Sequence, residues 1–489
     1  MKLRLIVTAL MLLTLMSTSV LADIGDTLWT GFYGLGDTEA AYSVKETLDK
    51  GFIIAGFSTS YNYDNKDFYL VRTDADGDTL WTRTYGGNFD DVALSVAATD
   101  DGCFIVAGWT KSFGAGGTDF YLVKTDPQGD TMWTRTYGSP FEDTAKCVQQ
   151  TADGGYVICG TTDYNDYQHD DFDVYVIKTD AHGEIDWTYH SGGVVDDGAN
   201  CIIQTSNGDY MISGYTACAG GNNNIYVEKI SSFGTNIWYW GFHPGSDNMA
   251  YSIVEASDGD YVVAGRTFDH YNAVEFYLMK ISNNGSVLWE RTFGDSHCEL
   301  GYSIDRTPDD GYIIGGAKWI SFWPDTTQFY LVKTDSEGNM LWDRTYMYGG
   351  LDEGSCVIST SDDHYAFAGY SNWMGPYNFD YCLMKIEGTG TTDIKSDDLA
   401  APASFRLESN YPNPFNAATI IKYELSEPAD VTLEIYDILG RKITTLINYQ
   451  QSAGYHQAIW NADDLPSGMY FYKLQTKNCI ETMMMTLLK

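Results

Sequence analysis

The chain has 489 residues, with 29 basic and 67 acidic side chains and a formal net charge of −38. A field of this sign repels nucleic acid and anionic lipid, so neither is expected as a partner. The 37 tyrosines and 49 glycines favour strands and turns over long helices.

Residues 1–22 have the pattern of a secretory signal peptide. Lys2 and Arg4 precede a mostly apolar run, and Val20 and Ala22 offer the small residues that a signal peptidase requires. No later apolar run approaches the ~18 residues that a membrane-spanning helix needs. The sequence therefore predicts an exported chain without a membrane span.

Seven tryptophans recur at intervals of 51 to 54 residues, and each follows a glycine by four positions. The tryptophans are Trp29, Trp81, Trp133, Trp187, Trp238, Trp289 and Trp342. The phrases "ALSVAATDDGCFIVAGWT" and "DFYLVKTD" have later counterparts in "AYSIVEASDGDYVVAGRT" and "EFYLMKIS". A fixed period of this length is typical of repeat architectures, with one supersecondary unit per repeat.

Each repeat predicts four short antiparallel strands, bounded by Gly, Asp and Asn turns. In the second copy the strands are expected at Ala93–Thr99, Phe104–Gly108, Phe120–Thr125 and Thr131–Tyr137. Four strands per ~50 residues, repeated seven times, indicate an all-β, seven-bladed β-propeller over residues 23–388. A linear sheet solenoid is the alternative.

The order of the phrases also predicts how the ring closes. The mature chain begins with a tryptophan strand, "DTLWTGFYG", whereas the last unit ends at "DYCLMKIEG" with no tryptophan strand after it. The N-terminal strand is therefore expected to complete the last blade, which removes an unpaired sheet edge.

The acidic stretch "DADGD" around Asp74, Asp76 and Asp78 raises the question of a calcium loop. Among the copies the glycine persists, while the residue before it becomes Gln128, His182 or another type. A glycine that relieves strain in a tight turn explains this pattern, and the aspartates are left with at most an adventitious cation.

One polar residue per repeat precedes the first strand, and six of the seven are acidic. The residues are Glu39, Asp91, Asp143, Asp197, Asn248, Glu299 and Asp352. If the first strand lines the axis, they form a ring that would bind a ligand or a cation such as calcium. The alternative is that each side chain caps backbone amides and joins neighbouring blades.

The loops between the second and third strands differ from copy to copy and carry aromatic residues. These are Tyr61, Tyr63, Tyr164, Tyr167, Trp319, Trp323 and Trp373. Exposed aromatic rings beside Asp and Asn suit a glycan or a protein partner, and the alternative is that they only cover the rim.

The nine cysteines follow the repeat rather than a disulfide framework. Cys147, Cys201 and Cys356 share a position that is serine in the other four copies, which indicates packing of small side chains. Cys147 and Cys159 are expected opposite each other on adjacent strands, so an exported chain could join them in a disulfide.

No catalytic motif such as HExxH or GxSxG occurs, so the sequence names no catalytic residue or cofactor. A binding protein is the main prediction. The alternative is an extracellular glycan hydrolase or lyase that uses carboxylates such as Asp90, Asp91, Asp196 and Asp197.

After residue 388 the repeat stops. Residues 389–403 form a polar linker, and residues 404–489 alternate apolar and polar residues in the manner of a small Ig-like β-sandwich of about seven strands.

The phrases "YPNPFNAATIIKYEL", "VTLEIYDILGRKI", "AGYHQAIWNA" and "LPSGMYFYKL" stand in this segment in that order. Their motif positions are Tyr411, Pro412, Asn413, Pro414, Phe415, Gly440, Arg441 and Gly468, with Lys489 at the end. The segment resembles the type IX secretion system type A C-terminal sorting domain, whose relative is the Ig-like domain of flagellar hook-capping proteins. The departure is a sparse basic end, with Lys477 and Lys489 only.

The resemblance implies engagement of the type IX secretion machinery and a secreted or outer-membrane surface location, with removal of the tail and attachment to surface glycolipid as a further expectation. The repeats themselves resemble bacterial secreted propeller repeats, which imply a fold and no activity.

Overall fold

The computed structural model describes residues 25–487, apart from 35–37, 61–62, 164–170, 219–221, 244, 246, 269–273, 295–297, 323–324, 374–378, 389–404, 408–409, 411–414, 416–417, 427–428, 452–453, 463–464 and 478. The chain folds as two compact units, Met1–Thr391 and Thr392–Lys489. The expected signal peptide and linker lie outside the described residues. Among the described residues, every regular element is a β-strand.

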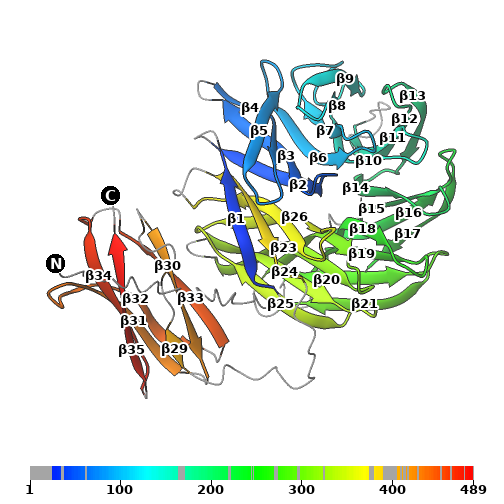
Figure 1. Cartoon of the computed structure of the whole chain (residues 1–489). Coiled ribbons are helices and arrows are strands. Elements are labelled where there is room, and N and C mark those ends of the chain that lie inside the picture. Colours follow the sequence, from blue (N-terminus) through cyan, green and yellow to red (C-terminus); the bar gives the residue numbers. More distant parts are fainter. Residues whose placement is uncertain are drawn as a thin grey trace, which may run out of the picture. The chain divides into compact units, whose positions relative to one another are not determined.

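The first unit consists of seven four-stranded antiparallel sheets, as the repeat predicts, and we call them blades 1 to 7 (Figure 1). Their first strands, which lie at the propeller axis, are β2 (Glu39–Glu46), β6 (Asp91–Ala98), β10 (Asp143–Gln150), β14 (Asp197–Gln204), β18 (Met249–Glu255), β22 (Glu299–Arg306) and β26 (Asp352–Ser359). The second strands are β3 (Phe52–Ser60), β7 (Phe104–Thr110), β11 (Tyr156–Thr162), β15 (Tyr210–Ala217), β19 (Tyr261–Phe268), β23 (Tyr312–Phe322) and β27 (Tyr365–Ser371).

The third strands are β4 (Tyr63–Thr73), β8 (Asp119–Thr125), β12 (Asp173–Thr179), β16 (Asn223–Ile230), β20 (Val274–Ile281), β24 (Asp325–Thr334) and β28 (Asp380–Ile386). The outer strands are β5 (Thr79–Tyr85), β9 (Thr131–Tyr137), β13 (Ile185–Ser191), β17 (Asn236–Phe242), β21 (Val287–Phe293), β25 (Met340–Tyr346) and, in blade 7, β1 (Thr27–Tyr33).

The core of the propeller lies between neighbouring blades. The third strand β8 is buried along its whole length, whereas the outer strand β9 alternates between exposed and half-buried residues. Phe120 and Leu122 of blade 2 pack against Val148 and Ile158 of blade 3, and equivalent clusters recur at the other junctions. Because both faces of a blade are covered by its neighbours, the middle strands read as continuous apolar runs.

The ring closes as the sequence predicts. Strand β1 pairs antiparallel with β28, so the start of the chain supplies the outer strand of blade 7 (Figure 1). The hydroxyl of Tyr346 in blade 6 donates a hydrogen bond of 2.7 Å to the carbonyl oxygen of Gly25. The chain thus joins its first strand to its last blade and leaves β28 without a free edge.

The glycine and the tryptophan of each repeat link successive blades. Gly77 has φ of +86°, and a Cβ atom there would lie 2.7 Å from the Trp29 ring of the preceding outer strand. The Tyr33 hydroxyl of that strand donates a 2.7 Å hydrogen bond to the Gly77 carbonyl. Asp74 accepts the amides of Asp76 and Asp78 at 3.0 and 2.9 Å, so this aspartate closes the turn.

The basic residue of the "FYLVKT" phrase is buried in every blade and forms an ion pair. In blade 7, Lys385 lies 2.9 Å from Asp362, which belongs to the turn between the first two strands. The equivalent pairs are Arg72–Asp49, Lys124–Asp101, Lys178–Asp153, Lys229–Asp209, Lys280–Asp258 and Lys333–Asp309. Each pair fastens the third strand to the turn that follows the first strand.

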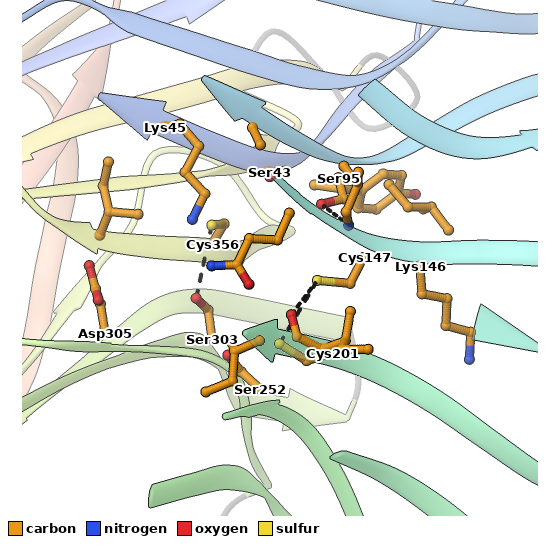
Figure 2. A pocket seen from close by; sticks show the side chains of 18 of the residues that line it. Ser43, Lys45, Ser95, Lys146, Cys147, Cys201, Ser252, Ser303, Asp305 and Cys356 are labelled. Carbon is orange, nitrogen blue, oxygen red and sulfur yellow. Dashed lines mark hydrogen bonds between the residues drawn. The ribbon is translucent and has the colours of Figure 1, made fainter. Parts of the chain in front are cut away.

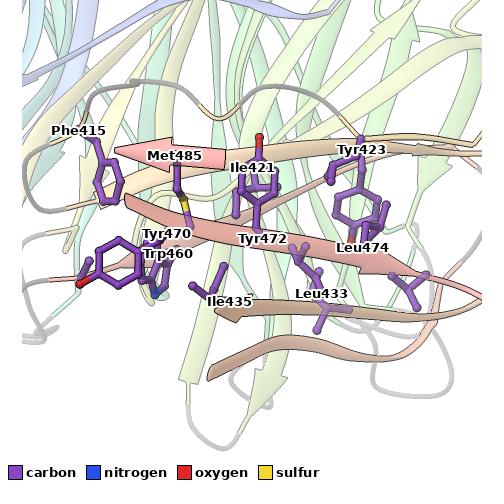
Figure 3. Packing of buried hydrophobic residues seen from close by; sticks show 14 of the residues in the cluster. Phe415, Ile421, Tyr423, Leu433, Ile435, Trp460, Tyr470, Tyr472, Leu474 and Met485 are labelled. Carbon is purple, nitrogen blue, oxygen red and sulfur yellow. The ribbon is translucent and has the colours of Figure 1, made fainter. Parts of the chain in front are cut away.

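The second unit contains two sheets, ordered β29-β30-β33 and β32-β31-β34-β35. Their strands are β29 (Arg406–Leu407), β30 (Ala418–Leu425), β31 (Ala429–Asp437), β32 (Lys442–Gln451), β33 (Gly454–Asn461), β34 (Gly468–Gln475) and β35 (Ile480–Leu487). Side chains from both sheets, among them Tyr423, Leu433 and Tyr472, form one buried core (Figure 3). This unit is therefore the small β-sandwich that the sequence predicts.

No helix in the described part of the chain has the length and apolar character to cross a membrane.

Candidate functional site

The polar residue that precedes each first strand is buried in all seven blades. The exposed fraction is 5% for Asp197 and 0% for Glu39, Asp91, Asp143, Asn248, Glu299 and Asp352. None of the seven is among the residues that line the axial cavity. The predicted ring of carboxylates at the mouth of the channel is therefore displaced from the axis into the wall.

These seven residues bond to their own and neighbouring loops. Ser58 donates to Glu39 at 2.8 Å, and Thr267 donates to Asn248 at 2.7 Å, in each case from the second strand of the blade. Asp143 accepts the Ser139 amide at 2.6 Å. The bond from the Ser139 amide matches the alternative role, in which these side chains cap backbone amides.

Burial raises the pKa of two of the carboxylates at this position. It raises the pKa of Asp352, although the hydroxyl of Ser371 and the amides of Tyr348 and Gly349 lower it. Burial likewise raises the pKa of Asp197. Among the described residues, no three or more His, Cys, Asp or Glu side chains are grouped so that they could hold a metal ion.

The carboxylates considered for catalysis are engaged in the same framework. Asp90 accepts the Lys66 amide at 3.1 Å, and Asp196 accepts the Phe172 amide at 3.0 Å. Their neighbours Asp91 and Asp197 are buried. These four side chains lie in the blade junctions and outside the axial cavity.

Of the loop aromatics, the structure describes the side chains of Trp319 and Trp373. Trp373 is 44% exposed, stacks on Phe32 with 4.7 Å between ring centroids, and donates its indole N–H to Asp380 at 2.8 Å. Trp319 is half-buried in β23. Tyr61, Tyr164, Tyr167, Trp323 and the side chain of Tyr63 lie outside the described residues.

The first strands enclose a cavity of about 920 Å³ on the propeller axis. Each of these strands carries a β-bulge three residues after the buried polar position. A bulge places one unpaired residue opposite the ladder and re-aims its side chain. The seven bulge residues, which all line the cavity, are Tyr42, Leu94, Lys146, Asn200, Tyr251, Tyr302 and Ser355.

One side of this bulge ring is aromatic. Tyr251 and Tyr302 meet edge to face with 5.1 Å between centroids, and Tyr42 meets Tyr370 at 6.4 Å. The Tyr370 hydroxyl donates to Glu353 at 2.6 Å. Burial and the Glu353 charge raise the pKa of Tyr42 to about 12, so its hydroxyl remains a neutral donor.

The opposite side of the bulge ring is polar. Lys146 donates to the Asn200 side-chain oxygen at 2.9 Å, and its ammonium lies 5.3 Å from the Tyr215 ring centre. Burial lowers the pKa of Lys146 to about 8. Asn200 in turn donates to the Ala250 carbonyl at 2.7 Å, which fixes its orientation. The same cavity is also lined by Lys45 and Asp305 (Figure 2).

Directly after the bulge, a ring of serine and cysteine joins the blades. Ser43 accepts the Val96 amide of the next blade at 3.2 Å, and Ser95 accepts the Val148 amide at 3.1 Å. The members of this Ser/Cys ring are Ser43, Ser95, Cys147, Cys201, Ser252, Ser303 and Cys356 (Figure 2). A small polar side chain fits here because it must reach the neighbouring backbone without filling the cavity.

The predicted pair Cys147 and Cys159 stands in register on β10 and β11, and all nine cysteines are free thiols. Cys147 also lies beside Cys201 of blade 4, with 4.0 Å between the sulfurs. The sequence repeat could not reveal the contact between Cys147 and Cys201, because it arises from the packing of one blade against the next.

Sequence reasoning missed the bulge residues. They occupy the variable place in phrases such as "AAYSV", "VALSV", "TAKCV" and "GANCI", between two positions that always hold a small residue. That single changing position in a constant phrase was the available signal. Its direction toward the axis depends on the bulge, which appears only once the strands are paired.

In the second unit, Phe415 is 2% exposed and packs on Trp460 with 5.6 Å between centroids. Gly440 has φ of +75° in a turn where Arg441 pairs with Asp437 at 2.7 Å. Gly468 begins β34. The motif residues Tyr411, Pro412, Asn413, Pro414 and Lys489 lie outside the described residues.

Residues 409–486 match the family model of the secretion system C-terminal sorting domain. Among curated proteins, the regulatory protein FlaEY of Caulobacter vibrioides is 24% identical over 161 residues, which are 29% of this chain and 17% of that protein. The chain therefore corresponds to a small part of that relative's length.

Two solved structures are similar in outline. PorZ, described as an essential surface component of the type IX secretion system of Porphyromonas gingivalis, has 11% identity and a TM-score of 0.43, over 95% of this chain and 61% of that chain. A Penicillium chrysogenum α-L-arabinanase bound to arabinobiose has 11% identity and a TM-score of 0.41, over 60% and 93%. At such scores the fold rests on this chain's own strand pairing.

The strand order and the family match lead to one conclusion about the molecule. The chain is a seven-bladed β-propeller protein that carries a type IX secretion system sorting domain over residues 409–486, and it is secreted or held at the outer-membrane surface.

Proposed function

We propose that the propeller is a binding module, displayed outside the cell by its sorting domain, which takes the end of a glycan chain into the axial cavity. The observation that carries this proposal is the bulge ring. Seven blades repeat the same backbone, but the residue that each bulge turns toward the axis is not the same in all of them: it is tyrosine in three blades and Leu, Lys, Asn or Ser in the other four. A residue that only stabilises the fold is expected to be the same in every blade, because the blades share one backbone. A site for an asymmetric ligand is expected to carry different side chains in different blades.

The chemistry of the cavity suits a saccharide. Tyr251 and Tyr302 offer apolar ring surface on one side, and Lys146 and Asn200 offer donors and an acceptor on the other. Sugars combine an apolar ring face with hydroxyl groups that both donate and accept, so they match such a divided lining. A cavity of about 920 Å³ has room for one or two sugar rings.

A glycan array with the purified chain, with and without calcium, identifies the saccharide. Isothermal titration then compares the wild type with Tyr302→Ala and Asn200→Ala. We expect each substitution to weaken binding about tenfold, which corresponds to roughly 1.4 kcal/mol. The matched control is Tyr239→Ala, because Tyr239 is 64% exposed on the outer strand β17.

Three outcomes would contradict the proposal. Binding that survives both cavity substitutions but disappears in Trp373→Ala places the site on the rim loops. An array without any bound glycan leaves a protein partner as the ligand. Turnover of the bound glycan, abolished by substitution of Asp196 or Asp90 without a change in melting temperature, makes the chain an enzyme.

A further inference from the structure

Three cysteine thiols gather where blades 3 and 4 meet the axial cavity. The Cys147 sulfur lies 4.0 Å from the Cys201 sulfur, across the junction of β10 and β14 (Figure 2). Cys159 stands opposite Cys147 on β11 of the same blade. Cys147 is therefore the shared member of two thiol pairs, one within its blade and one between blades.

The two thiol pairs differ in how accessible their sulfurs are from the axial cavity. Cys147 and Cys201 are half-buried and both line the axial cavity. Cys159 is 0% exposed and belongs to the apolar core between the blades, beside Val157 and Ile212. A small oxidant that enters the cavity consequently meets Cys147 and Cys201, and the mixed disulfide formed on either sulfur has room only on the cavity side.

The surroundings favour Cys147 as the attacking sulfur. Hydrogen bonding with the Cys159 and Cys201 thiols outweighs burial and holds the pKa of Cys147 well below its usual value, and the nearby Lys45 ammonium adds to this effect. The pKa of Cys201 is raised. Thiolates are the reactive species in disulfide exchange, so the first step falls to Cys147.

We propose that Cys147 and Cys201 form a disulfide that ties blade 3 to blade 4 at the cavity wall. Export carries the chain into compartments where disulfides form and persist. The oxidant is a small disulfide such as glutathione disulfide. The Cys147 thiolate attacks one of its sulfurs and releases one glutathione thiolate, which takes up a proton.

The Cys201 thiol then loses its proton and attacks the Cys147 sulfur of the mixed disulfide, which releases the second glutathione. The two cysteines lose two electrons and two protons in total, and one glutathione disulfide becomes two glutathione thiols. The protein sulfurs must approach from 4.0 Å to a bonding distance of about 2.05 Å.

The bond has a consequence for the cavity. Lys146 and Asn200 directly precede the two cysteines and share a hydrogen bond of 2.9 Å. A covalent link between the following residues would hold the polar side of the bulge ring at one spacing. The disulfide does not depend on which ligand the cavity binds. Its test and the test of the glycan proposal are therefore independent of each other.

The test begins with the full mature chain, purified after export or equilibrated with a glutathione buffer, with free thiols then alkylated. Trypsin cuts after Lys146, Lys178 and Lys229, so Cys147 and Cys159 share peptide 147–178 while Cys201 lies in peptide 179–229. We expect mass spectrometry without reduction to find these two peptides joined, and fragmentation to place the link at Cys147 and Cys201.

Two variants sharpen the test. Cys159→Ser is expected to keep the joined peptides, and Cys201→Ser is expected to lose them. In the wild type and in Cys159→Ser, reduction should lower the melting temperature, and in Cys201→Ser it should not. A link inside peptide 147–178, or full alkylation of Cys147 and Cys201 in the oxidised wild type, overturns the proposal. The wild-type mapping is decisive even if a variant fails to fold.

Discussion

At the residue scale, the recurring glycine and tryptophan together form the contact between successive blades. They stand four positions apart in the chain but contact different blades. The ring of Trp81, at the edge of blade 1, packs on Gly129 at the edge of blade 2, and the Tyr85 hydroxyl donates to the Gly129 carbonyl at 2.6 Å. The glycine is required both for its positive φ and for the close approach of the neighbouring ring.

A comparison of two glycines with the same backbone conformation separates the effect of positive φ from the effect of the close tryptophan ring. Gly129 has φ of +82° and Gly154 has φ of +83°, but a Cβ atom would lie 2.9 Å from Trp81 in the first case and would meet nothing within 4 Å in the second. Gly154→Ala should lower the free energy of unfolding by about 1 kcal/mol through backbone strain alone.

Gly129→Ala should lower the free energy of unfolding by about 2 to 3 kcal/mol, because the Trp81 ring must also move. Urea denaturation followed by tryptophan fluorescence measures both variants. Equal losses for the two substitutions would show that the tryptophan contact between blades contributes nothing.

At the scale of the element, the buried basic residue of each third strand explains why "KT" follows the apolar run. Lys385 of β28 is 6% exposed, and its ammonium reaches Asp362 in the turn after β26. The sequence placed the four strands of blade 2, since those expected there correspond to β6, β7, β8 and β9 within two residues at each end. It did not place the β-bulges, because a bulge is a shift in register between paired strands and leaves no mark in the hydrophobic pattern.

The ion pair of blade 7 predicts an acid-sensitive contribution to stability. Partial burial raises the pKa of Asp362, but hydrogen bonds from Thr360 and Lys385 outweigh it and lower the pKa to about 2. Since this value lies below the value of about 3.9 in an unfolded chain, the pair stabilises the fold above pH ~4 and loses its effect as the pH falls toward 2.

Asp362→Asn should therefore unfold at lower urea concentration than the wild type at pH 6, and the difference should shrink steadily between pH 4 and pH 2.5. The exposed turn residue Asp76 supplies the control, because Asp76→Asn removes an equal charge outside these ion pairs. A deficit of Asp362→Asn that stays constant over this range would exclude the ion pair as its cause.

At the scale of the whole molecule, the chain consists of two units, each with its own hydrophobic core. The propeller closes on itself through β1 and β28, and the sandwich has its own buried core around Tyr472 and Trp460. Among the residues that the structure describes, the sandwich core and the blade 7–blade 1 core each contain residues of one unit only. A chain that lacks one unit should consequently still fold the other.

Deletion of residues 404–489 should leave a folded propeller in the periplasm, because the sorting domain that directs export across the outer membrane is absent. Fractionation of cells with an antibody against the propeller measures its location. Circular dichroism and thermal melting of the truncated chain show that loss of export is not loss of folding, and full-length Tyr302→Ala should still reach the surface. Arrival of the truncated chain at the surface would contradict a sorting role for this unit.

The sequence by itself determined the architecture. A period of 51 to 54 residues fixed seven blades, the missing tryptophan strand fixed the closure, and ordered motifs fixed the sorting domain. These properties are local or repetitive, so hydrophobic pattern and turn chemistry suffice to specify them. Tertiary structure decided which side chains face the axis. The buried carboxylates such as Asp143 entered the wall, while bulge residues such as Lys146 and Tyr302 lined the cavity, because orientation depends on strand register and on the packing of one blade against the next.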